Sequence, residues 1–249
     1  MIIGPSLETQ RMAEHISKQF DSELEAIRSN VLGMAGLVEE QVRLAMEALA
    51  TGDLVTVNKV LEQEIRVNAM HLQLDDMCIH MIARRQPAAG DLRMVMTVIK
   101  SVEDLERIGD KAARICQRTK NIYEAGRLQV PRFNELNHVA EEALDMLSRT
   151  LDAFARLDAV QATEVIRDDR RIDDEYRALQ RQLITLMMED PRTISLTMDI
   201  LWIAKAIERI ADLAVNVAEQ VVFLVKGQDV RHKTADEVER LVMAPPSEA

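Results

Sequence analysis

Two short stretches of this chain place a pair of carboxylates four residues apart. Glu106 and Asp110 lie in LERIGDKAARI, and Glu208 and Asp212 lie in IERIADLAVNV. The stretches share Glu, Arg, Ile and Asp at matching places and are 102 residues apart (106 to 208). On a helix, side chains at this spacing stand on one face, where two like charges cost about 0.2–0.5 kcal/mol. Each pair therefore calls for a neutralising cation.

That cation is either a bound metal ion or a neighbouring side chain. Hard cations such as Mg²⁺, Mn²⁺ or iron prefer oxygen ligands, and both carboxylates of a pair can reach one ion. Alternatively, Arg107 and Arg209 stand three residues before Asp110 and Asp212, which is salt-bridge spacing in a solvated charged face. The spacing favours salt bridges, whereas the internal repetition favours metal, so both interpretations stay open.

The second stretch continues its row of oxygen-bearing side chains. Asn216 and Glu219 follow Asp212 at spacings of four and three, so four such side chains share one helical face. The predicted metal ligands are therefore Glu106, Asp110, Glu208, Asp212, Asn216 and Glu219. The first helix of each half can complete the shells, through the candidates Glu39, Glu40, Glu142 and Asp145.

One further motif allows a different function. Glu135 and His138 have the Glu-x-x-His spacing of ferritin-like di-iron bundles, so a carboxylate-bridged metal store or oxidase is the alternative. That fold needs two such motifs, and this chain has one, so we interpret His138 as a solvated side chain. Asp173 and Asp174 are interpreted as surface or interhelical charges. No nucleophile-elbow, P-loop or zinc-protease motif occurs, so no catalytic residue is predicted and we expect no enzyme.

Composition limits the partners. With 31 basic and 42 acidic residues among 249, the chain has a net charge of −11, which disfavours binding to nucleic acid or anionic lipid. Cys78 and Cys116 form no paired motif and predict buried reduced thiols. Because no secretory signal or uninterrupted apolar span occurs, we expect a cytoplasmic protein without membrane insertion.

Six long segments have apolar residues at alternating spacings of three and four, the pattern of amphipathic helices. With 3% aromatic residues and little Gly or Pro, the chain favours helices over sheets. The predicted segments are 20–49, 53–84, 91–123, 140–154, 172–186 and 203–224, followed by a short charged helix at 234–243. The apolar row of the second segment includes Leu61, Ile65, Leu72 and Ile79. We predict an all-α fold with two tandem, homologous three-helix bundles of long antiparallel helices, over residues 1–126 and 127–249.

Several distinctive strings, in order along nearly the whole chain, resemble those of the PhoU family of bacterial phosphate-uptake regulators. The strings are HISKQFDSELEAIR (15–28), ARRQPAAGDLR (83–93), DLERIGD (104–110), DAFARLD (152–158), LMMEDPRTI (186–194), IERIAD (207–212) and VKGQDVRH (225–232).

The resemblance implies a homodimer of paired three-helix bundles without catalysis. Family members restrain the phosphate-starvation response, and they are thought to link the ATPase of the phosphate ABC transporter to a membrane sensor histidine kinase. The resemblance thus implies peripheral attachment at the inner face of the membrane through protein partners. The family's metal-binding motifs match Glu106 with Asp110 and Glu208 with Asp212. In the first half Arg114 and Gln117 replace Asn216 and Glu219, so the second site has the fuller set of ligands.

Overall fold

The computed structural model describes residues 7–126 and 133–244, and within these ranges it contains helices and no strand. Six long helices and one short one follow in order, with one turn of 3₁₀-helix, Pro191–Thr193, before the sixth. The helices are α1 (Leu7–Thr51), α2 (Leu54–Arg85), α3 (Ala89–Glu124), α4 (Phe133–Arg156), α5 (Ala159–Glu189), α6 (Ile194–Lys226) and α7 (Ala235–Met243). The predicted all-α fold is confirmed.

The second helix of each half begins at an aspartate cap. Asp53 accepts hydrogen bonds from the backbone N–H groups of Val55 (2.9 Å) and Thr56 (3.3 Å). Asp158 accepts bonds from the N–H groups of Val160 and Gln161 at 2.9 and 3.0 Å. Such caps satisfy N–H groups that the first helical turn leaves unpaired. The two halves therefore share a local start signal as well as the acidic pairs.

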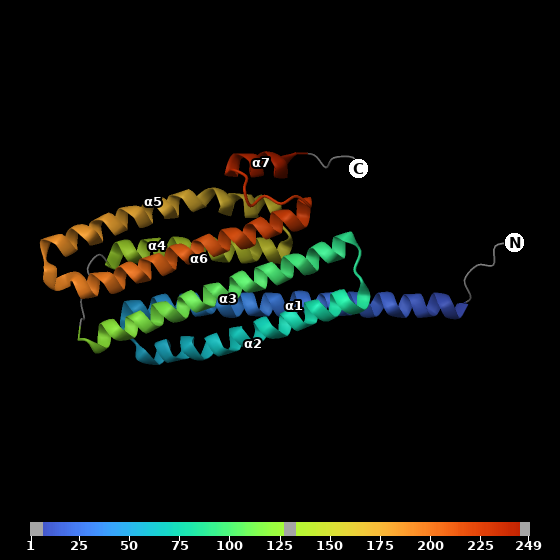
Figure 1. The fold of residues 1–249 in the computed structure, drawn as a ribbon, viewed down its shortest axis with the longest axis horizontal. Coiled ribbons are helices and arrows are strands. Elements are labelled where there is room, and N and C mark those ends of the chain that lie inside the picture. Colours follow the sequence, from blue (N-terminus) through green and yellow to red (C-terminus); the bar gives the residue numbers. More distant parts are fainter. Residues whose placement is uncertain (1–6, 127–132, 245–249) are drawn as a thin grey trace.

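Helices α1–α3 form one antiparallel bundle and α4–α6 form a second, and α3 and α6 lie side by side where the bundles meet (Figure 1). The contact includes a salt bridge from Arg118 of α3 to Asp199 of α6, at 3.0 Å. At the α1–α4 side, Arg28 donates to the carbonyl oxygen of Ala155 at 2.9 Å. The short helix α7 packs on α5. The third helix of each bundle is thus central, with neighbours on several sides.

Aliphatic and methionine side chains fill a continuous core that runs through both bundles. Cys78 and Cys116 lie in this core as buried free thiols, as predicted. The helices are longer than the apolar rows indicate, because α1 begins at Leu7 and α5 at Ala159, well before Phe20 and Ile172. The predicted boundary between residues 126 and 127 adjoins the segment 127–132, which lies outside the described residues. In the described part of the chain, no helix is long and apolar enough to span a bilayer.

One apolar row lies on the surface instead of in the core. Ile65, Leu72 and Ile79 of α2 are 71%, 68% and 59% exposed. The buried positions of α2 are instead Val57, Val60, Gln63, Val67, Leu74, Cys78 and Met81. When a helix has two apolar faces, the neighbouring helices decide which face is buried. Here α1 and α3 cover the face opposite to Ile65, Leu72 and Ile79. We call Ile65, Leu72 and Ile79 the α2 stripe.

Candidate metal centre

Three carboxylates converge between α5 and α6. An oxygen of Asp173 on α5 and oxygens of Glu208 and Asp212 on α6 all lie within 4.8 Å of one another. Glu208 is buried, whereas Asp173 and Asp212 are partly exposed. The four-residue spacing on α6 turns both of its carboxylates towards α5, and Asp173 meets them from the second helix of the bundle. We call these three residues the α5–α6 cluster.

A fourth carboxylate adds negative charge beside the cluster. The pKa of Asp169 is raised to about 6, first by burial and then by the charges of Asp212, Asp173 and Glu208. Three cations act in the opposite direction: Lys205 donates to Glu208 at 2.5 Å, Arg209 donates to Asp212 at 2.5 Å, and Arg177 donates to Asp173 at 2.8 Å. Four carboxylates therefore face three basic side chains, which leaves an excess of one negative charge.

Glu208 carries the clearest sign that a cation fits this cluster. Its Oε1 accepts the bond from Lys205, but its Oε2 is buried and has no hydrogen-bond partner among residues 7–126 and 133–244. Nε of Arg209 is 3.8 Å from Oε2, too far for a hydrogen bond. A buried carboxylate oxygen left unpaired is costly, and a metal ion would satisfy it. The residues therefore suit a hard divalent cation.

The first bundle holds a related but better neutralised group. Burial raises the pKa of Glu64 on α2, and the neighbouring charges of Asp110 and Glu106 add to this. Gln41 of α1 donates to Glu64 at 2.8 Å. Asp110 is paired with Lys111 at 3.0 Å and with Arg114 at 2.9 Å, and these contacts outweigh its burial and lower its pKa. Side chains of the protein thus already balance most of the charge on this group.

The salt bridges predicted for the repeated arginines form in only one half. Arg209 pairs with Asp212, as the three-residue spacing indicates. Arg107 instead pairs with Glu103 at 2.5 Å and approaches Asp104 at 3.8 Å. Asp110 finds Lys111 and Arg114 in its place. The repeated sequence therefore does not produce a repeated set of ion pairs.

Sequence reasoning missed the contribution of the second helices. Asp169 and Asp173 correspond to Glu64 and Asn68 by the same offset that relates the two caps, 105 residues (53 to 158, 64 to 169 and 68 to 173). Asp173, interpreted above as a surface or interhelical charge, belongs to the α5–α6 cluster. Aligning the caps of the two halves would have revealed this second repeated pair. Because the first half has the neutral Asn68 where the second half has Asp173, the first group carries one negative charge fewer.

Asn216 and Glu219 lie further along α6 and have different neighbours. Asn216 is exposed, and its side chain forms a hydrogen bond with Asp104 of α3. Asp104 is buried, and this burial is the main reason that its pKa is raised to about 6. Partial burial raises the pKa of Glu219 to about 7, and the charges of Asp229, Asp104 and Asp169 contribute while Arg231 opposes them. The predicted row of four thus divides into the pair Glu208–Asp212 and a pair beside Asp104.

The metal-ligand candidates on the first helix of each bundle lie away from the acidic pairs of α3 and α6. Glu39, Glu40 and Asp145 line a groove of about 490 Å³ between α1 and α4. Glu40 pairs with Arg43 at 2.7 Å, and Asp145 accepts a bond from Arg149 at 2.8 Å. Glu142 pairs with Arg171 of α5. The structure therefore brings the second helix of each bundle to the acidic pairs. In the first bundle, α1 contributes Gln41 there.

Open grooves border both acidic groups. A pocket of about 560 Å³ beside the α5–α6 cluster is lined by Asp169, Asp212 and Asn216 together with Arg107, Lys111 and Arg209. A larger one, of about 840 Å³, is lined by residues of α2, α3 and α6, including Glu64 and Asp110. Trp202 lies in this larger pocket, 5.8 Å from the guanidinium of Arg118. Solvent and ions therefore have access to both groups.

Comparison with known families gives two matches within the chain. The family model described as PhoU domain matches residues 31–119 and 136–221. The first match covers the second part of α1, all of α2 and most of α3, and the second covers most of α4, all of α5 and most of α6. The two matched segments therefore correspond to the two bundles.

Individual relatives and solved structures that resemble this chain are also PhoU proteins. A phosphate-specific transport system accessory protein PhoU homolog from Pseudomonas aeruginosa is 45% identical over 89% of this chain and 91% of its own. The accessory protein PhoU of Escherichia coli K12 is 39% identical over 97% and 100%. The crystal structure of PhoU from P. aeruginosa superposes with a TM-score of 0.81 at 44% identity, over 84% of this chain and all of the other. For the phosphate transport system regulatory protein PhoU from Streptococcus pneumoniae, the TM-score is 0.77 at 30% identity, over 85% and 99%.

Proposed function

This chain belongs to the PhoU family, and on that premise we propose that it is a non-catalytic regulator of phosphate uptake. It links the ATPase of a phosphate ABC transporter to a sensor histidine kinase, and so restrains uptake and the phosphate-starvation response. The observation that carries the proposal is the pair of family matches over both bundles, in a chain whose relatives are named accessory proteins of phosphate-specific transport. It acts in the cytoplasm and reaches the membrane through these partners.

Two surfaces support a role in protein contacts. The α2 stripe exposes Ile65, Leu72 and Ile79 at seven-residue intervals, which places them in one line along a rigid helix. Exposed apolar rows of this kind commonly form protein interfaces. We assign the stripe to a homodimer, because a two-fold axis brings the same row of each copy together. The net charge of −11 suits docking of the remaining surface to basic patches of the partners.

We further propose that the α5–α6 cluster holds a divalent cation, Mg²⁺, Mn²⁺ or Fe²⁺. Asp173, Glu208 and Asp212 would supply its protein ligands, and water would complete the shell. The unpaired Oε2 of Glu208 and the excess of carboxylates over cations support this assignment. The ion would tie α5 to α6 and so fix the surface that this bundle presents to partners.

A genetic test addresses the regulatory role. Deleting the gene should release expression of a phosphate-repressed reporter at high phosphate, and the intact gene should restore repression. Normal repression in the deletion strain would contradict the proposal. Pull-downs with the transporter ATPase and the sensor kinase, at high and low phosphate, should recover both partners. If the purified protein instead oxidises bound iron with consumption of oxygen, the ferritin-like alternative is correct.

A further inference from the structure

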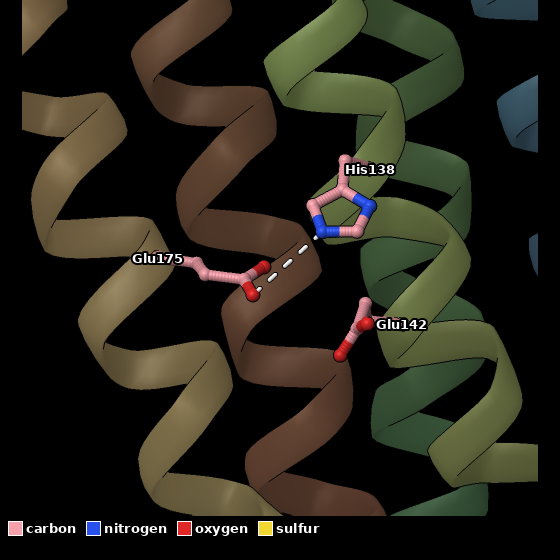
Figure 2. A group of neighbouring side chains, drawn as sticks. All are labelled: His138, Glu142 and Glu175. Carbon is pink, nitrogen blue, oxygen red and sulfur yellow. Dashed lines mark ion pairs between the residues drawn. The ribbon is translucent and has the colours of Figure 1, made fainter.

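A second group of metal-binding side chains lies between α4 and α5. His138 and Glu142 project from successive turns of α4, and Glu175 reaches them from α5 (Figure 2). Nε2 of His138 is 3.7 Å from Oε1 of Glu175, and one ligand atom from each residue lies within 4.8 Å of the others. These residues are distinct from the α5–α6 cluster, which uses the carboxylates of Asp173, Glu208 and Asp212.

The two carboxylates of this group differ in how they are held. Glu142 is held by Arg171, whose Nη1 donates to its Oε1 at 2.8 Å. Oε2 of Glu175 is buried, and nothing in the described part of the chain hydrogen bonds to it. A buried carboxylate oxygen without a partner is a destabilising arrangement that a cation would relieve. Glu175 therefore supplies an independent sign, besides the clustering, that a ligand binds here.

His138 provides both chemical selectivity and access. Its side chain is 61% exposed and lines a pocket of about 330 Å³ together with Glu175. An imidazole nitrogen with two carboxylates suits a borderline cation such as Zn²⁺, whereas ligand sets of oxygen alone suit Mg²⁺ and Mn²⁺. Ligand atoms about 2.0–2.1 Å from a tetrahedral ion lie about 3.4 Å apart. Small side-chain rotations would therefore bring the three residues to coordination distance.

We propose that His138, Glu142 and Glu175 form a Zn²⁺ site with three protein ligands and a fourth position open to water. Arg171, which is half exposed, stays on Glu142 and orients that carboxylate. The ion joins the first two helices of the second bundle. This site is independent of the regulatory proposal and of the α5–α6 cluster, so each can fail without the other.

Calorimetric titration of the metal-free full-length chain with Zn²⁺, and separately with Mn²⁺, tests the site. His138→Gln and Glu175→Gln should each weaken Zn²⁺ binding at least about tenfold and leave Mn²⁺ binding unchanged. His71→Gln is the matched control. Nε2 of His71 lies 3.4 Å from Asp75 on α2, at the spacing that separates His138 from Glu142. This control should bind Zn²⁺ as the wild type does.

Nitrogen-15 NMR of the histidine rings gives a second measurement that does not depend on the variants. Zn²⁺ should shift the ring nitrogens of His138 at one molar equivalent and leave those of His71 unchanged. The proposal is wrong if Zn²⁺ fails to bind, or if His138→Gln binds it as tightly as the wild type. It is equally wrong if His71→Gln weakens binding to the same extent, or if only Asp212→Asn abolishes it.

Discussion

A carboxylate oxygen of Asp173 on α5 lies within 4.8 Å of one of Asp212 on α6. Like charges this close repel each other. Arg209 pairs with Asp212 and Arg177 pairs with Asp173, but Oε2 of the adjacent Glu208 has no hydrogen-bond partner in the described residues. The same relation between second and third helices recurs in the first bundle, where Glu64 lies near Asp110, but there Lys111 and Arg114 compensate the charge. A cation therefore has more to gain in the second bundle.

Metal-dependent stability should be asymmetric between the halves. At a Mn²⁺ concentration of 100 times Kd, binding adds about 2.7 kcal/mol to the free energy of unfolding, or roughly 5–10 °C in Tm for a chain of this size. Asp212→Ala should abolish this increase more fully than Asp110→Ala, because Asp110 already has two cationic partners. Calorimetric scans with and without Mn²⁺ measure the difference.

The control for this comparison is Asp174→Ala, which removes an exposed carboxylate that neighbours Asp173 and pairs with Arg177 at 3.1 Å. It should keep the full increase in Tm. An equal loss from Asp110→Ala and Asp212→Ala would show that the two acidic groups bind metal alike.

The raised pKa of Glu219 predicts a pH-dependent stability. Folding raises this pKa from 4.5 to about 7, so between these values the folded protein holds a proton that the unfolded chain releases. The contribution of this group is complete below about pH 4.5 and is lost as the pH rises through about 7. Glu219→Gln cannot ionise, so its stability relative to the wild type should increase from pH 5 to pH 8.

Urea unfolding of metal-free protein across that range tests this prediction, and the slope cannot exceed about 1.4 kcal/mol per pH unit. The exposed Glu141→Gln serves as the control for loss of a carboxylate on the surface. A stability difference between Glu219→Gln and the wild type that stays constant with pH would refute the assignment.

The α2 stripe predicts the effect of a charge on self-association. Leu72→Glu places a carboxylate in the middle of the proposed dimer contact, where it would lose its hydration, and should shift the protein to monomers. Gln73→Glu adds the same charge one residue away, off the stripe, and should leave the dimer intact. Sedimentation velocity distinguishes the species. A Leu72→Glu protein that remains dimeric would place the contact on another surface.

The turn between α1 and α2 depends on a glycine in a crowded place. Gly52 has φ +71°, and an added Cβ would overlap the ring of Tyr123, whose hydroxyl donates to the carbonyl oxygen of Leu49 at 3.0 Å. Gly126 has the same φ of +71° with open space around it. Gly126→Ala should therefore lower the free energy of unfolding by about 1–2 kcal/mol, the cost of the left-handed backbone conformation alone.

Gly52→Ala should cost about 1–3 kcal/mol more than that, because the Tyr123 ring must also move. Chemical denaturation of both variants gives the comparison. Equal losses would mean that Tyr123 moves aside without penalty.

The sequence by itself determined the helical class, the order of the long helices and several of their ends. The start of the second segment at residue 53 and the short helix from residue 234 follow from local signals, carried by a few neighbouring residues. The acidic pairs on α3 and α6 could be read in the same way, because four-residue spacing is a property of one helix. Each of these inferences concerned residues close together in the chain.

The tertiary structure decided which helices meet at each face. Periodicity identifies an apolar or acidic face but does not show which helix packs against it. In the structure, Asp169 and Asp173 lie beside Glu208 and Asp212. The candidates Glu142 and Asp145 pair with arginines elsewhere. For the same reason the α2 stripe was not distinguishable from a core face. His138 gained two carboxylate neighbours only when α4 packed against α5. Contacts between distant segments depend on packing, and packing is a property of the whole chain.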